Sequence, residues 1–175
     1  MTSQNQKIVF RRAGVGDLPG FFALFSKTIQ DYFPEYPAKT RKYFLAKEYS
    51  PLAVRAQLKA KEIAIYLALA SGGAVGYLMV RPITGGVTLA VWLAVDKDFQ
   101  GRGIASRLLR MWEKEARQDG FHKLHLWTDK RNLRFYKSRG FVYVGKIPQN
   151  YYGADDYLFY KTVQPPKEKK YLSHA

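Results

Sequence analysis

A glycine-containing turn between a strand and a helix is the part of the chain best suited to binding a ligand. The apolar segment 87–95 is followed by Gln100, Gly101, Arg102 and Gly103, and then by an amphipathic helical pattern. Unpaired backbone N–H groups and the positive end of the helix dipole gather at the start of a helix. Glycines let a phosphate approach without obstruction by side chains, and Arg102 adds positive charge. The sequence therefore predicts an anion site here; a plain strand-to-helix connection is the alternative.

Two common phosphate-binding patterns do not occur in the sequence. The P-loop pattern Gly-x-x-x-x-Gly-Lys-Ser/Thr is absent. The dinucleotide pattern Gly-x-Gly-x-x-Gly begins at Gly101 and Gly103 but has Ser106 in place of its third glycine. The turn therefore predicts neither a nucleoside triphosphate nor a dinucleotide as its ligand.

The turn instead resembles the acetyl-CoA signature of the GNAT acetyltransferases, Gln/Arg-x-x-Gly-x-Gly/Ala, which Gln100, Gly103 and Ala105 fill here. A second segment resembles the Asn-x-x-x-Tyr-x-x-x-Gly-Phe segment of the same family and carries Asn132 and Tyr136. The two segments stand in the order that the family has. The resemblance implies a GNAT acyl-CoA acyltransferase fold and an acetyl-CoA-dependent N-acetyltransferase that needs no metal.

The resemblance also implies a role for each residue of both segments. Asn132 would hydrogen-bond the pantetheine, and the Val95 N–H would stabilise the oxyanion. Tyr136 would contact the cofactor beside the thioester sulfur and protonate the departing thiolate. For Tyr136 the alternative is an aromatic side chain packed under the last strands. The residues implied to contact acetyl-CoA through the backbone are Leu93, Ala94 and Val95 beside the pantetheine, and Gln100, Gly101, Arg102, Gly103, Ile104 and Ala105 around the diphosphate.

The general base is missing from its usual places. Many family members carry a Glu on one of two central strands, but neither 87–95 nor 123–128 contains a carboxylate, and Trp127 stands at its usual position on the second. Water and His125 are the alternatives for relaying the proton. An α-amine with a pKa of ~8 is neutral at pH 7 far more often than a lysine with a pKa of ~10.4. A site without a strong base therefore favours an α-amine as the acceptor.

A tyrosine pair gives a second indication of the acceptor. Residues 149–152 are predicted to form the loop between the last two strands, and they include Tyr151 and Tyr152. This loop is similar to the Tyr-Tyr loop of protein N-terminal acetyltransferases, which implies that both tyrosines hold the acceptor. The Glu-Asp-Ala run of those enzymes reads Asp-Asp-Tyr at 155–157, which departs from the pattern. A tyrosine-rich loop that covers the edge of the sheet is the alternative.

The hydrophobic patterns predict a mixed α/β fold around these residues, with a central, mostly antiparallel sheet and helices on both faces. The predicted strands are 7–12, 63–70, 74–81, 87–95, 123–128, 141–146 and 156–163. The predicted helices are 18–32 with Asp17 as N-cap, 39–61 with an interruption at Ser50 and Pro51, 104–119, and 132–139.

Length and composition fit one globular domain. With 175 residues, 47% of them hydrophobic, we expect a single GNAT domain over 1–163 and a flexible basic tail over 164–175. There is no cysteine, which excludes disulfides and thiolate metal sites and fits a reducing compartment. The three histidines are too few and too scattered to predict a metal cluster. The sequence has no signal-like start and no apolar run of membrane length, so we expect a cytoplasmic protein without a membrane partner.

The chain is strongly basic, because 29 Lys and Arg against 14 Asp and Glu leave a net charge of +15. Such a charge attracts polyanions, so a nucleic-acid-binding module is one alternative function. A GNAT fold that binds acyl-CoA as a sensor without turnover is another. The motifs favour an enzyme that acetylates an amine-bearing small molecule, protein or peptide, as a monomer or homodimer. The basic residues are spread over the predicted helices instead of forming one run, as shown by Arg41, Lys42, Arg107, Arg110 and Arg131.

Overall fold

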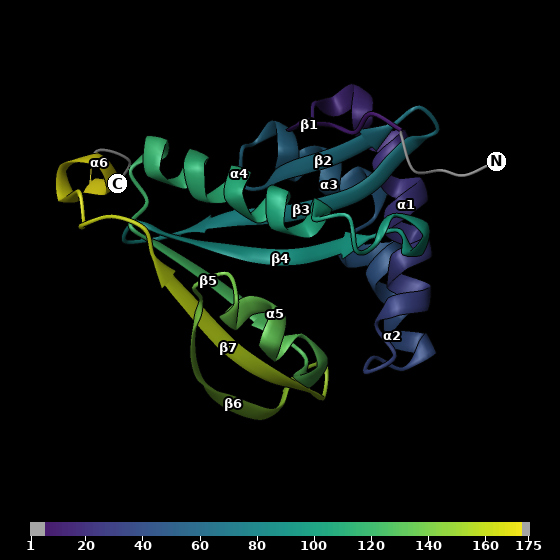
Figure 1. The fold of residues 1–175 in the computed structure, drawn as a ribbon. Helices are drawn as coiled ribbons and strands as arrows, with labels where there is room; N and C mark the ends of the chain where they lie inside the picture. The colour runs from purple at the N-terminus through teal and green to yellow at the C-terminus, as the bar shows by residue number, and fades with distance from the viewer. Residues whose placement is uncertain (1–5, 173–175) are drawn as a thin grey trace. The chain divides into compact units, whose positions relative to one another are not determined.

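The computed structural model describes residues 6–172, and its seven strands form one sheet in the order β1-β2-β3-β4-β5-β7-β6 (Figure 1). The chain divides into two compact units, here called the first unit (residues 1–79 and 92–109) and the second unit (80–91 and 110–175). The predicted mixed α/β architecture with a mostly antiparallel sheet is confirmed. A single domain over 1–163 stays a prediction.

The first unit contains three α-helices and a π-helix between its first two strands. Strands β1 and β2 pair in antiparallel register, with Val9 opposite Leu69. The elements of this unit are β1 (Val9–Arg12), α1 (Leu18–Tyr32), α2 (Ala38–Tyr43), α3 (Pro51–Lys59), β2 (Ala64–Ala70), the first part of β3 (Gly73–Ile83), the end of β4 (Val87–Val95) and the first turns of α4 (Ile104–Asp119).

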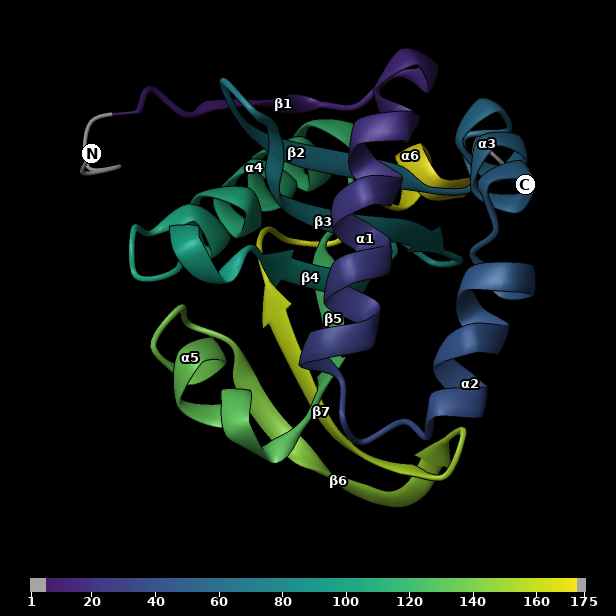
Figure 2. The same cartoon turned by 90° about the vertical axis from the view of Figure 1, so that its right-hand side faces the viewer.

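Helices cover both faces of the strands in the first unit, as predicted. Successive residues of a strand point to opposite faces. The Tyr77 ring of β3 lies 5.3 Å from that of Phe21 in α1, and Figure 2 shows α1 in front of β2 and β3. The preceding residue, Gly76, faces Ile104 at the start of α4. Farther along α4, the Arg107 guanidinium lies over the ring of Phe10 in β1.

The second unit is built on a ladder that joins the start of β4 to β5, β7 and β6. Strand β5 (Lys123–Thr128) pairs parallel with the start of β4 and antiparallel with β7 (Ala154–Thr162), which pairs antiparallel with β6 (Val142–Tyr151). Helix α4 is amphipathic as predicted, and its Trp112 is 1% exposed, with its indole N–H donating to Thr88 Oγ1 at 3.3 Å. The unit also contains α5 (Leu133–Lys137) and α6 (Glu168–Leu172).

Three local predictions differ in detail from the structure. Asp17 stands at the N-cap of α1, but its carboxylate accepts from Gly14 N (2.8 Å) and Arg11 instead of capping that helix. The predicted helix 39–61 is divided into α2, a π-helix at Phe44–Glu48 and α3, which Ser50 caps through a bond from Ala53 N. The strand predicted at 141–146 continues to Tyr151 as β6.

The C-terminal segment contains helix α6. Lys170 Nζ donates to Gln118 O at 3.0 Å, and Gln164 Nε2 donates to Phe121 O at 2.7 Å. These bonds attach the segment to the end of α4 and the residues after it. The flexibility of the tail over 164–175 stays a prediction, and its last three residues, which include His174, lie outside the described residues.

Candidate functional site

The turn between β4 and α4 has the backbone that the motif requires. A 3₁₀ turn at Lys97–Phe99 leads to Gly101 and Gly103, whose φ angles of 75° and 74° lie in the left-handed region. A residue with a side chain costs about 1–2 kcal/mol in that conformation, whereas glycine adopts it freely. Two glycines are therefore needed here by backbone geometry alone.

Side chains from the turn fold back onto it. Gln100 Nε2 donates to Val95 O at 3.1 Å, which joins the turn to the end of β4. Arg102 donates to Asp98 O at 2.9 Å, and its guanidinium lies 4.9 Å from the centre of the Phe99 ring. These contacts leave the space above the glycines open, because a Cβ added at Gly101 or Gly103 would meet nothing within 4 Å.

The helix start supplies the donors for an anion. The Arg107 N–H bonds to Gly103 O, so the helical hydrogen-bonding pattern begins at Gly103. The first N–H groups of a helix have no acceptor within it, so the amides of Ile104 and Ala105 point out of the helix end. Leu93, Ala94 and Val95 lie directly before the turn, beyond Ala90, where the pairing of β4 with β5 ends. The first unit thus contains all the residues whose backbone is predicted to contact the diphosphate and pantetheine, whereas Asn132 belongs to the second unit.

Tyr136 lies in the second unit, inside an aromatic cluster. It is 8% exposed, and its ring centre lies 5.1 to 5.8 Å from those of Phe135, Phe141 and Phe159. Burial raises the pKa of the Tyr136 phenol well above its ordinary value, Asp129 raises it further, and a hydrogen bond with Thr128 opposes the rise. The phenol is therefore protonated at neutral pH and can donate a proton, although the raised pKa makes it a weaker acid than an ordinary tyrosine. The surroundings fit the predicted acid, and they also fit a packed aromatic.

Asn132 precedes α5 and is exposed. Its side-chain Nδ2 donates to Asp129 Oδ2 at 3.2 Å. Asp129 also accepts from Arg131 N at 2.6 Å, so one carboxylate organises the start of the helix. The Asn132 side chain is therefore oriented by Asp129 in the second unit, whatever it binds.

Candidate proton acceptors lie on β5 and β7. His125 is half-buried, and desolvation lowers its pKa, with Lys123 and His122 adding to the effect. Such a histidine is neutral at pH 7 and can accept a proton. Trp127, which stands at the usual position of the family's Glu, is 37% exposed.

The sequence analysis did not identify Asp156 of β7 as a candidate. This residue is 7% exposed and accepts from Asn150 Nδ2 at 2.8 Å. Burial raises the pKa of its carboxyl. An acidic residue at an inward position of a strand was the available signal.

The tyrosine pair lies at the tip of the β6–β7 hairpin and not in an open loop. Tyr151 ends β6 and pairs with Ala154, and the rings of Tyr151 and Tyr152 are 4.7 Å apart in an edge-to-face arrangement. Gln149 and Tyr152 both have positive φ angles, 49° and 50°. Two aspartates hold this strained tip, since Asp155 accepts from Gln149 N at 3.0 Å and Asp156 holds Asn150. Such strain clusters at functional sites.

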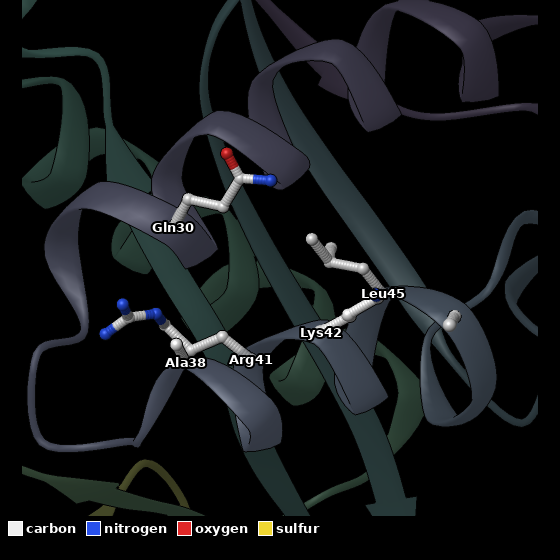
Figure 3. Close-up of a pocket in the computed structure, with 6 residues that line it drawn as sticks. Gln30, Ala38, Arg41, Lys42 and Leu45 are labelled. Atoms are coloured by element: carbon white, nitrogen blue, oxygen red, sulfur yellow. The ribbon is translucent and has the colours of Figure 1, made fainter.

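A separate pocket of about 500 Å³ lies in the first unit (Figure 3). None of the predicted site residues lines it. Its lining residues are Gln30 from α1, Ala38, Arg41 and Lys42 from α2, and Leu45 and Ala46 from the π-helix.

Within the described part of the chain, residues 6–172, no three His, Asp or Glu side chains are grouped closely enough to hold a metal ion. No helix within it is both long and apolar enough to cross a membrane.

The fold has many relatives among solved structures. One is PaiA N-acetyltransferase from Thermoplasma acidophilum in complex with coenzyme A (TM-score 0.74, 16% identity, 89% of this chain and 99% of that chain). Others are ribosomal-protein-alanine N-acetyltransferase from Brucella melitensis (0.70, 20%, 88% and 99%) and Ard1 from Thermoplasma volcanium (0.68, 19%, 90% and 98%). A search of curated protein sequences found no significant match.

The sequence itself matches the model of the acetyltransferase (GNAT) family over residues 23–141, which is more than half of the chain. The matched region includes the glycine turn at 100–105 and the segment at 132–141 that carries Tyr136. This chain therefore belongs to the acetyltransferase (GNAT) family.

Proposed function

We propose that this acetyl-CoA-dependent N-acetyltransferase moves the acetyl group to the α-amine of a peptide, or of a small amine that resembles one. The observation that carries the proposal is the open glycine turn at the mouth of α4, where Gly101 and Gly103 take the left-handed conformation. Oriented amides at a helix start bind phosphate groups without any further cation. The turn therefore fits the diphosphate of coenzyme A.

The other proposed cofactor contacts come from the turn itself, from the end of β4 and from Asn132. The backbone of residues 100–105 holds the diphosphate, and Leu93, Ala94 and Val95 pair with the pantetheine arm, which Asn132 also hydrogen-bonds. The position of Leu93–Val95 beyond the last β4–β5 pair supports this role, because that ladder does not use their backbone groups. Bound acetyl-CoA supplies the thioester that the amine attacks.

Direct attack of an amine on a thioester has three requirements. The amine must be neutral, the oxyanion needs hydrogen-bond donors, and the departing thiolate needs a proton. In our proposal the Val95 N–H donates to the oxyanion, and Tyr136, which burial keeps protonated, supplies the proton. His125, neutral at pH 7, accepts the amine proton directly or through water. An α-amine suits a site with such a weak base, because a fraction of the α-amine molecules is already neutral at pH 7.

The peptide character of the acceptor rests on Tyr151 and Tyr152. Two carboxylates, Asp155 and Asp156, bind the preceding residues Gln149 and Asn150 in the strained hairpin tip, and Tyr152 is 45% exposed. Two of the similar solved structures, from B. melitensis and T. volcanium, bear the names ribosomal-protein-alanine N-acetyltransferase and Ard1. We propose that the tyrosine pair flanks the acceptor amine and the first peptide residues.

We also propose a cytoplasmic monomer or homodimer whose GNAT domain spans 1–163 and whose basic tail spans 164–175. The absence of cysteine fits a reducing compartment. Analytical ultracentrifugation at several protein concentrations would determine the oligomeric state. Deletion of 164–175 should leave acetyl-CoA binding within twofold if the tail is not part of the domain.

Calorimetry with acetyl-CoA, followed by thiol-release assays, tests the function. We expect saturable binding of acetyl-CoA. For a peptide that carries one lysine, we expect faster thiol release when its α-amine is free than when its N-terminus is acetylated. Binding without thiol release for any peptide, polyamine or aminoglycoside would identify an acyl-CoA sensor instead. Absence of binding would overturn the proposed cofactor site.

A further inference from the structure

We propose that Tyr32 and Lys27 of α1 are positioning residues for acetyl-CoA, because they hold the turn that presents the diphosphate-binding amides. Neither residue belongs to a recognised motif of the sequence. The inference rests on the proposed function, in which residues 100–105 bind the diphosphate. It adds that a helix far away in the sequence determines how firmly this turn is held.

The contacts come from the last two turns of α1. The Tyr32 hydroxyl accepts a hydrogen bond from Lys97 N at 2.7 Å. Lys27 Nζ forms an ion pair with Asp96 Oδ2, also at 2.7 Å. Asp96 and Lys97 are the two residues that follow β4, so both contacts meet the chain at the point where the strand becomes the turn.

Asp96 passes this support on to the rest of the turn. Its second carboxylate oxygen accepts from Asp98 N at 3.1 Å, and its own N–H donates to Val75 O of β3 at 2.9 Å. Its carbonyl accepts from Phe99 N at 2.9 Å. Asp98 O in turn accepts from Arg102 at 2.9 Å. A continuous series of hydrogen bonds therefore runs from α1 to the residue between the two glycines.

Helix α1 is itself firmly anchored on the sheet, so it can act as a support. Thr28, the residue after Lys27, shares a 2.7 Å hydrogen bond with the buried hydroxyl of Tyr77 on β3. Phe21 and Phe25 pack their rings against the same tyrosine. The final turns of the helix thus keep a fixed distance from β3, while Tyr32 and Lys27 reach the turn after β4.

The charge state of the pair supports the same role. Partial burial acts to raise the pKa of Asp96, but the hydrogen bonds from Lys27 and from Asp98 N outweigh it, and the pKa lies below its ordinary value. The bond to Asp96 raises the pKa of Lys27. Both groups are charged at neutral pH. Since the Lys27 side chain is 41% exposed, the pair contributes little to overall stability, and its effect is on the geometry of the turn.

Substitutions that remove single contacts test the inference. In Tyr32→Phe we expect acetyl-CoA affinity to fall about fivefold, the factor that one typical hydrogen bond contributes. The kcat at saturating acetyl-CoA should stay within twofold, because the reacting groups are untouched. Lys27→Met should weaken binding in the same direction, and Lys27→Arg should restore it, because an arginine can also pair with Asp96.

Ser50→Ala is the matched control. It also removes a hydroxyl with a hydrogen bond in the first unit, but one that caps α3 and bonds neither to α1 nor to the turn. We expect it to lower the melting temperature at least as much as Tyr32→Phe does, while acetyl-CoA affinity stays within twofold. An equal loss of affinity in both variants would show a general destabilisation and overturn the inference.

Hydrogen exchange of the free protein separates this inference from the proposed function. Tyr32→Phe should speed exchange of the amides of 97–103 and leave those of β2 unchanged, with no ligand present. Unchanged exchange at 97–103 would refute the positioning role even if acetyl-CoA binds normally. If Tyr32→Phe speeds exchange but the parent protein does not bind acetyl-CoA, the contact between α1 and the turn is supported. In that case only the cofactor assignment is refuted.

Discussion

Gly76 lies against Ile104 so closely that a β-carbon at Gly76 would come within 2.9 Å of Ile104 Cγ2. The same β-carbon would be 3.4 Å from Val95 Cγ2. Val95 ends β4 and Ile104 begins α4, so this glycine on β3 determines how closely the two ends of the turn approach the sheet. A strand residue outside every motif therefore shapes the candidate cofactor site.

Gly76→Ala should lower the free energy of unfolding by about 1–3 kcal/mol, the usual cost of overpacking a core, and should weaken acetyl-CoA binding. Denaturant unfolding and calorimetry measure the two effects. Adding Ile104→Ala removes the clashing methyl group, so the double variant should lose less than the sum of the single losses. Strict additivity would show that the contact does not matter. Gly16→Ala, with nothing within 4 Å of the added carbon, is the control.

Gly103→Ala tests the diphosphate site directly. At φ 74° the alanine is strained by about 1–2 kcal/mol, and the turn will either keep that strain or move its amides. We expect acetyl-CoA affinity to drop at least tenfold by calorimetry. Gly145→Ala, at a glycine without a left-handed φ and with nothing within 4 Å, should bind like the parent. Equal affinities in the two variants would contradict the assignment.

Tyr136→Phe should reduce kcat by about 100-fold, the lower end of the usual contribution of a general acid. Acetyl-CoA affinity should stay within twofold, because the ring keeps its packing against Phe141 and Phe159. Steady-state kinetics and calorimetry separate the two quantities. Tyr143→Phe removes a hydroxyl from another tyrosine that contacts Phe159 and should leave kcat unchanged. If kcat survives in Tyr136→Phe, the tyrosine is a packing residue only.

Replacing both Tyr151 and Tyr152 by Ala should raise the Michaelis constant for an α-amino peptide at least tenfold. The pair presents two rings at the hairpin tip, and such rings provide contact area at little entropic cost. Acetyl-CoA affinity should not change. An unaltered Michaelis constant for every tested acceptor would remove this hairpin from the acceptor site.

The stability of the second unit should depend on pH through Glu113. Partial burial acts to raise the pKa of this carboxyl, but hydrogen bonds from Lys161 (2.6 Å) and Arg117 (2.9 Å) outweigh it, and the pKa lies below its ordinary 4.5. A lowered pKa means that the folded state binds the proton less tightly than the unfolded state. The stabilisation is therefore present above pH 4.5 and is lost as the pH falls below that value.

Lys161→Met should remove most of that stabilisation. Its unfolding free energy should fall below that of the parent at neutral pH, and the gap should narrow as the pH is lowered through and below 4.5. Denaturant titrations across this range measure the gap. Lys59→Met on α3 removes the same charge without a described ion pair and should give a small difference that does not vary with pH. A gap for Lys161→Met that is constant with pH would contradict the linkage.

The elements that carry the site were determined by local sequence. Strand β4 has the predicted bounds 87–95, and α4 begins at Ile104 and ends before Gly120, as its apolar spacing and flanking glycines indicated. Gly101 and Gly103, the glycines of the predicted turn, lie between these two elements, and both have left-handed φ angles. These features depend on stereochemistry and hydrophobic period within a few residues, and both can be read from neighbouring letters.

Only the tertiary structure decided which side chains act on those elements. The sequence placed Asp17 at a helix start, but the position of Arg11 directed its carboxylate elsewhere. It gave no sign that Tyr32 would meet Lys97, 65 residues away, or that Asp156 would be buried. Such contacts depend on how strands and helices that are distant in the sequence pack together. The type of a polar residue does not indicate whether its side chain faces water or a partner elsewhere in the fold.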